Sequence, residues 1–182
     1  HFAVNSQELR RMASDSVLDE RTLREIYLTG FEIVVKESAP KTIMSSYNLV
    51  NGTYANENAH LLQDILRRDW GFTGAVVTDW GGSNDHALGV KNGSTLEMPA
   101  PGGDAVRELL AAVKSGKITE ADVDARLDEL LTLIYDTHAA VQNHSRSFDA
   151  DAHHALARRA AAESTVLLKN EDNLLPLAAG TK

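Results

Sequence analysis

The carboxylate of Asp79 is the group in this sequence best placed to do chemistry. It follows residues 74–78, a run of small and β-branched side chains too short for a helix, which predicts a strand buried on both faces. A charge at the end of such a strand is costly unless a ligand or a partner uses it. Trp80 adds a flat apolar face on which a sugar ring can stack, and Gly81 and Gly82 let a ligand approach the backbone. On these residues alone, Asp79 is either a catalytic or binding carboxylate or the cap of the next helix.

The elements that position Asp79 are predicted to alternate between strands and helices. Apolar residues at helical spacing, capping residues and breakers indicate helices over 19–36, 58–69, 104–114, from 119 onward and 151–168. Short apolar runs indicate strands over 42–47, 74–78 and 94–98, and Asn51-Gly52 predicts a turn. The first helix is predicted to start with a capping box of Thr22 and Glu25. Predicted inward residues are Leu23, Ile26, Tyr27, Phe31, Val34, Val35, Leu61, Leu62, Ile65, Leu66, Val106, Leu109, Leu110, Val113, Val123, Leu127, Leu130, Leu131 and Ile134.

This order predicts an α/β fold in which parallel strands are joined by helical crossovers. The predicted strands carry Tyr47, Asp79 and Glu97 at their carboxyl ends, which is how a (β/α)8-type barrel builds its site. Three strands cannot close a barrel, which typically takes about 250 residues, so the chain is predicted to hold only part of one. Glu97 is either a site residue or a residue that orders the turn before Pro99.

The charge and composition of the chain argue against several classes of partner and binding site. The 182 residues carry a formal net charge of −8, which argues against nucleic acid or an anionic membrane as partner. No apolar run approaches the roughly 20 residues that span a bilayer. The absence of cysteine excludes disulfides and thiolate metal sites, and the histidines lack metal-ligand spacing. With no phosphate-binding loop or dinucleotide motif in the sequence, no cofactor and no metal is expected.

Ordered segments along nearly the whole chain form a specific pattern. They are His1-Phe2 with Asn5, Gln7 and Glu8; Asp19-Glu20-Arg21-Thr22-Leu23-Arg24-Glu25-Ile26-Tyr27; Ser46-Tyr47-Asn48 with Val50-Asn51-Gly52; Leu66-Arg67; Trp70-Gly71-Phe72; Val76-Val77-Thr78-Asp79-Trp80; Leu96-Glu97-Met98-Pro99; Ser164-Thr165-Val166-Leu167-Leu168-Lys169-Asn170; and Leu174-Leu175-Pro176-Leu177. Each piece alone is common, but the ordered series resembles glycoside hydrolase family 3, the β-glucosidase group. The last two segments are similar to the family's entry into its second domain.

The resemblance implies a retaining glycosidase that hydrolyses terminal β-D-glucosides by double displacement. Asp79 matches the family's nucleophile, which attacks the anomeric carbon and forms a covalent glycosyl-enzyme. His1 and Arg11 fall on positions that hold hydroxyls of the terminal sugar, and either Arg11 or its neighbour Arg10 fills the second of these. Tyr47 matches a ring that hydrogen-bonds the nucleophile, or it packs as an ordinary strand-end tyrosine.

Two further residues complete the predicted site. Trp80 forms the floor of the next subsite or fills the core with its indole, and Met44 lines the sugar pocket or fills the core. The Lys that usually precedes the His of this family motif has no counterpart in the sequence. The acid/base carboxylate normally comes from a later domain and is expected outside these residues. Residues 3–8 lack the Gly-rich loop with a His–Asp pair found in the related N-acetylglucosaminidases, which favours glucosidase or xylosidase specificity.

Together these observations predict three parts: the C-terminal part of a barrel over 1–137, a linker over 138–150, and a helix leading into a second α/β domain over 151–182. The expected partners are a β-glucoside or oligosaccharide, the remainder of the barrel and the following domain. Alone, the chain is expected to hydrolyse nothing. Because it would expose an open sheet edge and apolar helix faces, it is expected to bind a complementary fragment, to form a homo-oligomer or to be marginally soluble. The alternatives are a non-catalytic carbohydrate-binding or structural barrel fragment and a β-xylosidase of the same family.

Overall fold

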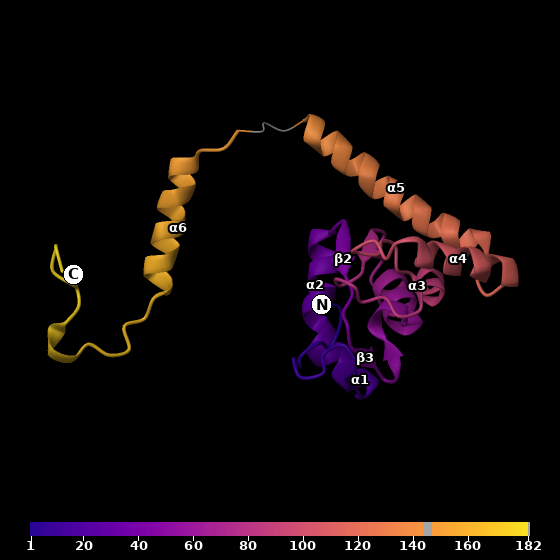
Figure 1. Ribbon diagram of the computed structural model, residues 1–182, viewed down its shortest axis with the longest axis horizontal. Helices are drawn as coiled ribbons and strands as arrows, with labels where there is room; N and C mark the ends of the chain where they lie inside the picture. The colour runs from indigo at the N-terminus through magenta and orange to yellow at the C-terminus, as the bar shows by residue number, and fades with distance from the viewer. Residues whose placement is uncertain (144–146, 182) are drawn as a thin grey trace. The chain divides into compact units, whose positions relative to one another are not determined.

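The computed structural model describes residues 1–143 and 147–181 and divides into two units, His1–Gln142 and Asn143–Lys182 (Figure 1). The second unit contains α6 (Ala150–Ser164) and the 3-10 turn η4 (Glu171–Asn173), so the helix predicted to reach 168 ends earlier. In the first unit, α5 (Glu120–Gln142) continues into the segment predicted as a linker, and 144–146 lie outside the described residues. No described helix is long and apolar enough to cross a membrane.

A short parallel array lies at the centre of the first unit. β2 (Thr42–Met44) pairs in parallel with β5 (Ala75–Val77), with Ile43 opposite Val76. Isolated parallel bridges join Phe2 to Ser45 and Val77 to Leu96, so four segments pair in chain order. The predicted α/β class with parallel pairing is therefore confirmed. The sheets in the described residues are small and open, and the strand predicted over 94–98 is reduced to the bridge at Leu96.

A second, three-stranded sheet is built around a tight hairpin. β3 (Leu49–Val50) and β4 (Thr53–Tyr54) are antiparallel, and β1 (Asp15–Ser16) pairs in parallel with β3. The hairpin turn has φ values of 51° at Asn51 and 84° at Gly52, the left-handed backbone that an Asn-Gly pair supplies at low cost. The predicted turn is confirmed, whereas β1 lies outside the predicted strands.

The helix predicted over 19–36 spans Glu20–Ser38 in three pieces: α1 (Glu20–Thr22), the π-helical η1 (Leu23–Leu28) and α2 (Thr29–Ser38). The predicted Thr22–Glu25 capping box is wrong. Asp19 caps the helix by accepting a hydrogen bond of 2.8 Å from the Thr22 N–H, and Glu25 pairs with Arg21. A π turn holds more residues than an α turn and shifts the buried face. Leu28 is buried as a result, while the predicted inward residues Ile26, Tyr27 and Val34 are exposed.

The main core forms where η3 (His60–Asp69) packs beneath the parallel array. The four residues predicted to face inward, Leu61, Leu62, Ile65 and Leu66, are fully buried together with Phe2. The ring of Phe2 makes edge contacts with Phe31 and Trp70, at centroid distances of 5.2 and 5.9 Å. This core fixes the first residues of the chain against β2.

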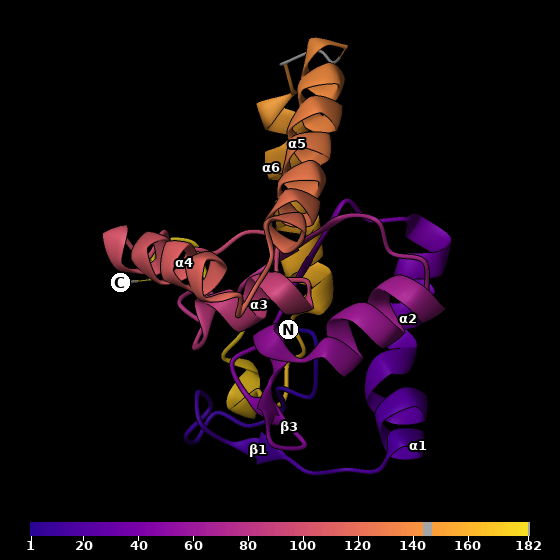
Figure 2. The same cartoon turned by 90° about the vertical axis from the view of Figure 1, so that its right-hand side faces the viewer.

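A smaller cluster joins α3 (His86–Asn92), α4 (Gly103–Ser115) and α5. Its buried members are Ala87, Ala112 and Ile118, packed against Val90, Leu109, Val113 and Val123. Small residues let these helices approach closely, so the face of α4 differs from the predicted one: Ala105 and Ala112 are buried, whereas Val106 and Leu110 are exposed. Leu127, Leu131 and Ile134 of α5, also predicted inward, are 38–50% exposed. In both views α2 and α4 lie on opposite sides of the first unit (Figure 2).

Candidate active site

Asp79 lies two residues beyond β5 and is only 6% exposed. Its Oδ1 accepts a hydrogen bond of 2.8 Å from the backbone N–H of Trp80. Its Oδ2 lies 3.0 Å from Nε2 of His1 and 3.7 Å from Nη2 of Arg11, yet among the described residues it accepts no hydrogen bond of normal geometry. The carboxylate therefore presents one buried, unbonded oxygen beside positive charge.

Asp79 does not cap the following helix. The cap of α3 is Asp85, whose Oδ1 accepts a 2.9 Å hydrogen bond from the Leu88 N–H. The prediction that Asp79 could cap this helix is therefore wrong. Its Oδ2 instead lies beside His1 and Arg11.

His1 and Arg11 reach Asp79 from the segment that precedes the first helix. Phe2 donates its N–H to the Met44 carbonyl at 3.0 Å, and this bond places His1 beside the end of β2. Nη2 of Arg11 lies 2.8 Å from Nε2 of His1, and Nε of Arg11 donates to Oδ1 of Asn5 at 3.2 Å. Since an imidazole nitrogen either donates or accepts a hydrogen bond, Nε2 of His1 can accept one from Arg11 or donate one to Asp79, but not both at once.

Tyr47 completes the cluster. The guanidinium carbon of Arg11 lies 4.9 Å from the centroid of its ring, a cation–π contact, and its hydroxyl donates to the Trp80 carbonyl at 2.8 Å. Burial and then the negative charge of Asp79 raise the pKa of Tyr47, so the phenol keeps its proton. A Cβ built at Gly82 would lie 3.3 Å from Cδ1 of Tyr47 and 3.1 Å from the Asp79 carbonyl oxygen, so a larger residue there would have to displace these neighbours.

The two remaining predicted residues lie at the edge of this cluster. The Trp80 side chain is exposed, the residue being 63% accessible, so the indole does not fill the core. Met44, at the end of β2, is 38% exposed and sits opposite Val77 in the parallel register. The structure therefore brings His1, Arg11, Tyr47 and Asp79 into one cluster linked through Arg11, and it joins Trp80 to them through its backbone.

Sequence reasoning did not find Glu57, a buried carboxylate behind the loop that follows Asp79. Glu57 is 3% exposed and accepts the N–H groups of Asn84 and Asp85 on Oε1, at 2.8 and 3.3 Å. His86 places Nδ1 2.8 Å from Oε2 of Glu97, so Glu97 is tied to α3. A single glutamate in a polar stretch has no periodic signature. The only local signal was its position between two asparagines directly after the hairpin.

The fold and the cluster define an α/β domain that places a buried carboxylate at the carboxyl edge of its parallel strands. Residues 1–133 match the model of the glycosyl hydrolase family 3 N-terminal domain, and the chain belongs to that family. Among the described residues, no group of three side chains is arranged to hold a metal ion.

Two glycosidases are similar to this chain over nearly its whole length. The thermostable β-glucosidase B of Acetivibrio thermocellus is 48% identical over 179 residues, which are 97% of this chain and 23% of that protein. An exo-α-(1→6)-L-arabinopyranosidase of Bifidobacterium breve is 44% identical over 180 residues, 99% of this chain and 24% of that protein.

Solved structures give the same picture. A family 3 β-glucosidase of Bifidobacterium adolescentis matches with a TM-score of 0.83 and 40% identity over 98% of this chain and 26% of its own. β-Glucosidase 3B of Thermotoga neapolitana, solved with α-D-glucose, matches with a TM-score of 0.83 and 38% identity over the same shares of both chains. The chain thus spans about a quarter of the length of these relatives.

Proposed function

We propose that this chain supplies the nucleophile and part of the terminal-sugar subsite of a retaining glycosidase that hydrolyses terminal β-D-glucosides. The observation that carries the proposal is Oδ2 of Asp79, buried, unbonded and 3.0 Å from His1. A nucleophilic carboxylate needs an oxygen that is free to attack the anomeric carbon. The β-glucosidases among the relatives supply the substrate class.

In the proposed reaction, Oδ2 of Asp79 forms a bond to the anomeric carbon while the glycosidic C–O bond breaks. The leaving oxygen takes its proton from a carboxylic acid outside this chain, and a water molecule then hydrolyses the covalent glycosyl-enzyme. His1 and Arg11 bind hydroxyls of the terminal sugar, and Tyr47 holds the backbone of Trp80 through its hydroxyl. Trp80 forms the floor of the next subsite, and Met44 lines the sugar pocket.

We further propose that the chain acts within a longer polypeptide, as the C-terminal part of a (β/α)8-type barrel over residues 1–137. Residues 138–150 then lead out of the barrel, and 151–182 enter a second α/β domain. The chain-order pairing of four parallel segments supports this arrangement, because barrels pair their strands in the same sequence. So does the length of the relatives, of which this chain covers about a quarter.

The test uses the complete polypeptide that carries this chain. Asp79→Asn keeps the shape and removes the nucleophile, so turnover of a β-glucoside is expected to fall by about four orders of magnitude or more while glucose still binds. A 2-fluoroglucoside is expected to add one fluoroglucosyl group to the peptide that contains Asp79. Asp124→Asn, on an exposed part of α5, is the matched control and should leave turnover unchanged. Near-normal turnover of Asp79→Asn would show that another residue is the nucleophile.

A substrate panel separates the alternatives. The arabinopyranosidase among the relatives makes an α-L-arabinopyranoside a necessary member of the panel, beside a β-D-glucoside and a β-D-xyloside. Preference for the xyloside or the arabinopyranoside would retain the mechanism and correct the specificity. Retained glucose binding with hydrolysis of none of the three would instead identify a carbohydrate-binding or structural module.

A further inference from the structure

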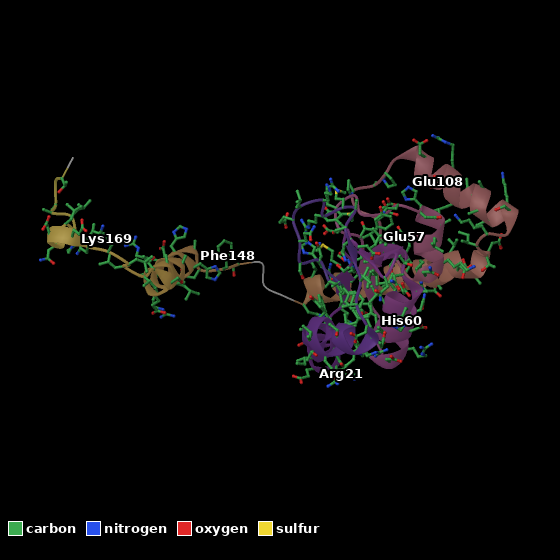
Figure 3. All side chains as sticks on the ribbon, turned by 90° about the horizontal axis from the view of Figure 1, so that it is seen from below. Arg21, Glu57, His60, Glu108, Phe148 and Lys169 are labelled. Atoms are coloured by element: carbon green, nitrogen blue, oxygen red, sulfur yellow. The ribbon has the colours of Figure 1, made fainter. Side chains whose placement is uncertain are left out.

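Glu57 is a buried carboxylate that the proposed reaction does not use. It ends the 3-10 turn η2 (Ala55–Glu57), and its side chain is labelled within the first unit in Figure 3. Burial raises the pKa of Glu57, and the N–H groups of Asn84 and Asp85, which its Oε1 accepts, oppose that rise. Burying a carboxylate is costly unless it is hydrogen-bonded, and Glu57 finds donors in the backbone N–H groups of residues 84 and 85.

These two residues form the far end of the loop 80–85, which connects Asp79 to α3. At the near end, Gly81 donates its N–H to the Met98 carbonyl and Gly82 donates to the Asp79 carbonyl, both at 2.8 Å. At the far end, Asn84 donates its N–H to Oε1 of Glu57 at 2.8 Å, and the carboxylate of Asp85 accepts a hydrogen bond of 2.7 Å from Lys117. The loop is therefore held between the end of Asp79's strand and Glu57.

The Trp80 side chain is carried by the backbone of this loop. Its high exposure means that packing does not hold the indole, so the backbone of the loop sets where the ring lies. The same backbone carries Gly82 against Tyr47 and the Trp80 carbonyl onto the Tyr47 hydroxyl. A shift of the loop at Asn84 would thus move the indole more than the carboxylate of Asp79, which is buried beside the parallel array.

We propose that Glu57 is a positioning residue that holds the loop 80–85 and thereby sets the surface that Trp80 offers to a second sugar ring, the leaving group of the substrate. The assignment rests on the proposed function for its substrate class. The support of the loop itself rests only on the contacts of Glu57 with Asn84 and Asp85.

The first test measures the loop directly, by hydrogen exchange of the Asn84 and Asp85 amides. Glu57→Leu removes the acceptor and is expected to speed exchange of both amides by about 10- to 100-fold, because both N–H groups lose a charged partner. Glu57→Gln keeps an Oε1 acceptor of the same shape and is expected to stay within about threefold of the wild type. If the leucine variant does not fold, Glu57→Ser, whose hydroxyl is too short to reach both amides, gives the same comparison. Unchanged exchange in the variant that folds would overturn the proposal.

The second test compares two substrates in the complete polypeptide: cellobiose, whose leaving group is a sugar, and methyl β-glucoside, whose leaving group is a single methoxy group. Glu57→Leu is expected to lower kcat/KM for cellobiose by about tenfold, mainly through KM, and for the methyl glucoside by less than about threefold. Glu57→Gln is expected to restore the cellobiose value, and Trp80→Ala to reproduce the leucine pattern. An equal loss for both substrates would show a general structural role and overturn the proposal.

The two experiments also separate this proposal from the proposed function. If the wild-type protein hydrolyses neither glucoside, the proposed function fails, and the amide exchange still decides whether Glu57 holds the loop. If the wild type hydrolyses both and Glu57→Leu changes neither exchange nor substrate preference, only the role of Glu57 is refuted.

Discussion

Glu129 is a largely buried carboxylate whose substitution is expected to destabilise the fold strongly. Its Oε2 lies 3.0 Å from Nη2 of Arg67 and its Oε1 2.7 Å from Nη2 of Arg126, and all three side chains are 11–14% exposed. Oε2 also accepts the Thr95 hydroxyl at 2.5 Å, and Thr95 Oγ1 accepts the Val76 N–H at 3.0 Å. One carboxylate thus compensates the charges of two largely buried arginines, and it contacts the middle of β5 through the Thr95 hydroxyl.

The cost of removing Glu129 follows from these contacts. Burial lowers the pKa of Arg67, Glu129 opposes this effect, and Arg126 adds to the lowering, so the pair of arginines depends on the carboxylate. Glu129→Ala leaves both guanidinium groups uncompensated and is expected to reduce the free energy of unfolding by ~3–5 kcal/mol. Glu129→Ala combined with Arg67→Met is expected to cost less than the sum of the single changes by ~0.5–3 kcal/mol.

The assay is urea unfolding followed by the fluorescence of the buried Trp70. Asp128→Ala, an exposed carboxylate beside Glu129 on the same helix, is the matched control. Surface changes of this kind usually stay within ~0.5 kcal/mol. A Glu129→Ala variant no less stable than Asp128→Ala, or additive single and double variants, would refute the reasoning.

Two further predictions concern the scaffold. Burial alone would lower the pKa of His60, but hydrogen bonds with Glu20 and Asp64 outweigh it and raise that pKa, so its ion pairs stabilise the fold fully below about pH 6.5 and are lost as pH rises through the raised value. The difference in urea midpoint between wild type and His60→Gln should therefore shrink from about pH 6 to about pH 9, and a constant difference would contradict this. A Cβ at Gly74 would overlap the Lys41 carbonyl oxygen and lie 2.8 Å from Cζ of Phe72, so Gly74→Ala should destabilise by ~1–3 kcal/mol or more. Gly30→Ala, with nothing within 4 Å, should instead stabilise α2 by ~0.5–1 kcal/mol, and similar effects of the two changes would disprove the steric argument.

The sequence predicted best where one physical signal acted alone. The four apolar residues of η3 recur at helical spacing and face one core, so their burial followed from periodicity. Asn51-Gly52 is tied to one turn geometry by its backbone preferences, and the hairpin formed as expected. Asp79, His1, Arg11 and Tyr47 were assigned from the resemblance, and the structure brings them together from three separate segments.

The sequence predictions were wrong where local backbone geometry or packing changed which residues are buried, or where an element carries few large apolar side chains. The π turn in η1 changed the helical phase, which exposed Ile26 and buried Leu28. α3 was not predicted, because its seven residues include Gly89 and few large apolar side chains, although Asp85 and Gly93 bracket it with ordinary caps. On α4 the buried face carries alanines, which a pattern based on large side chains overlooks. Glu57 has no pattern to detect, because its role depends on a loop that lies 27 residues away in sequence.

The pairing order of Phe2, β2, β5 and Leu96 follows the order of synthesis, so each segment is made after the partner on which it packs. Leu96 follows its partner Val77 by 19 residues, which take about one to four seconds to synthesise at ~5–20 residues per second. During that interval the edge of β5, next to Asp79, has one neighbour and one open side. A translational pause within this window would lengthen the time in which that edge can pair with another nascent chain.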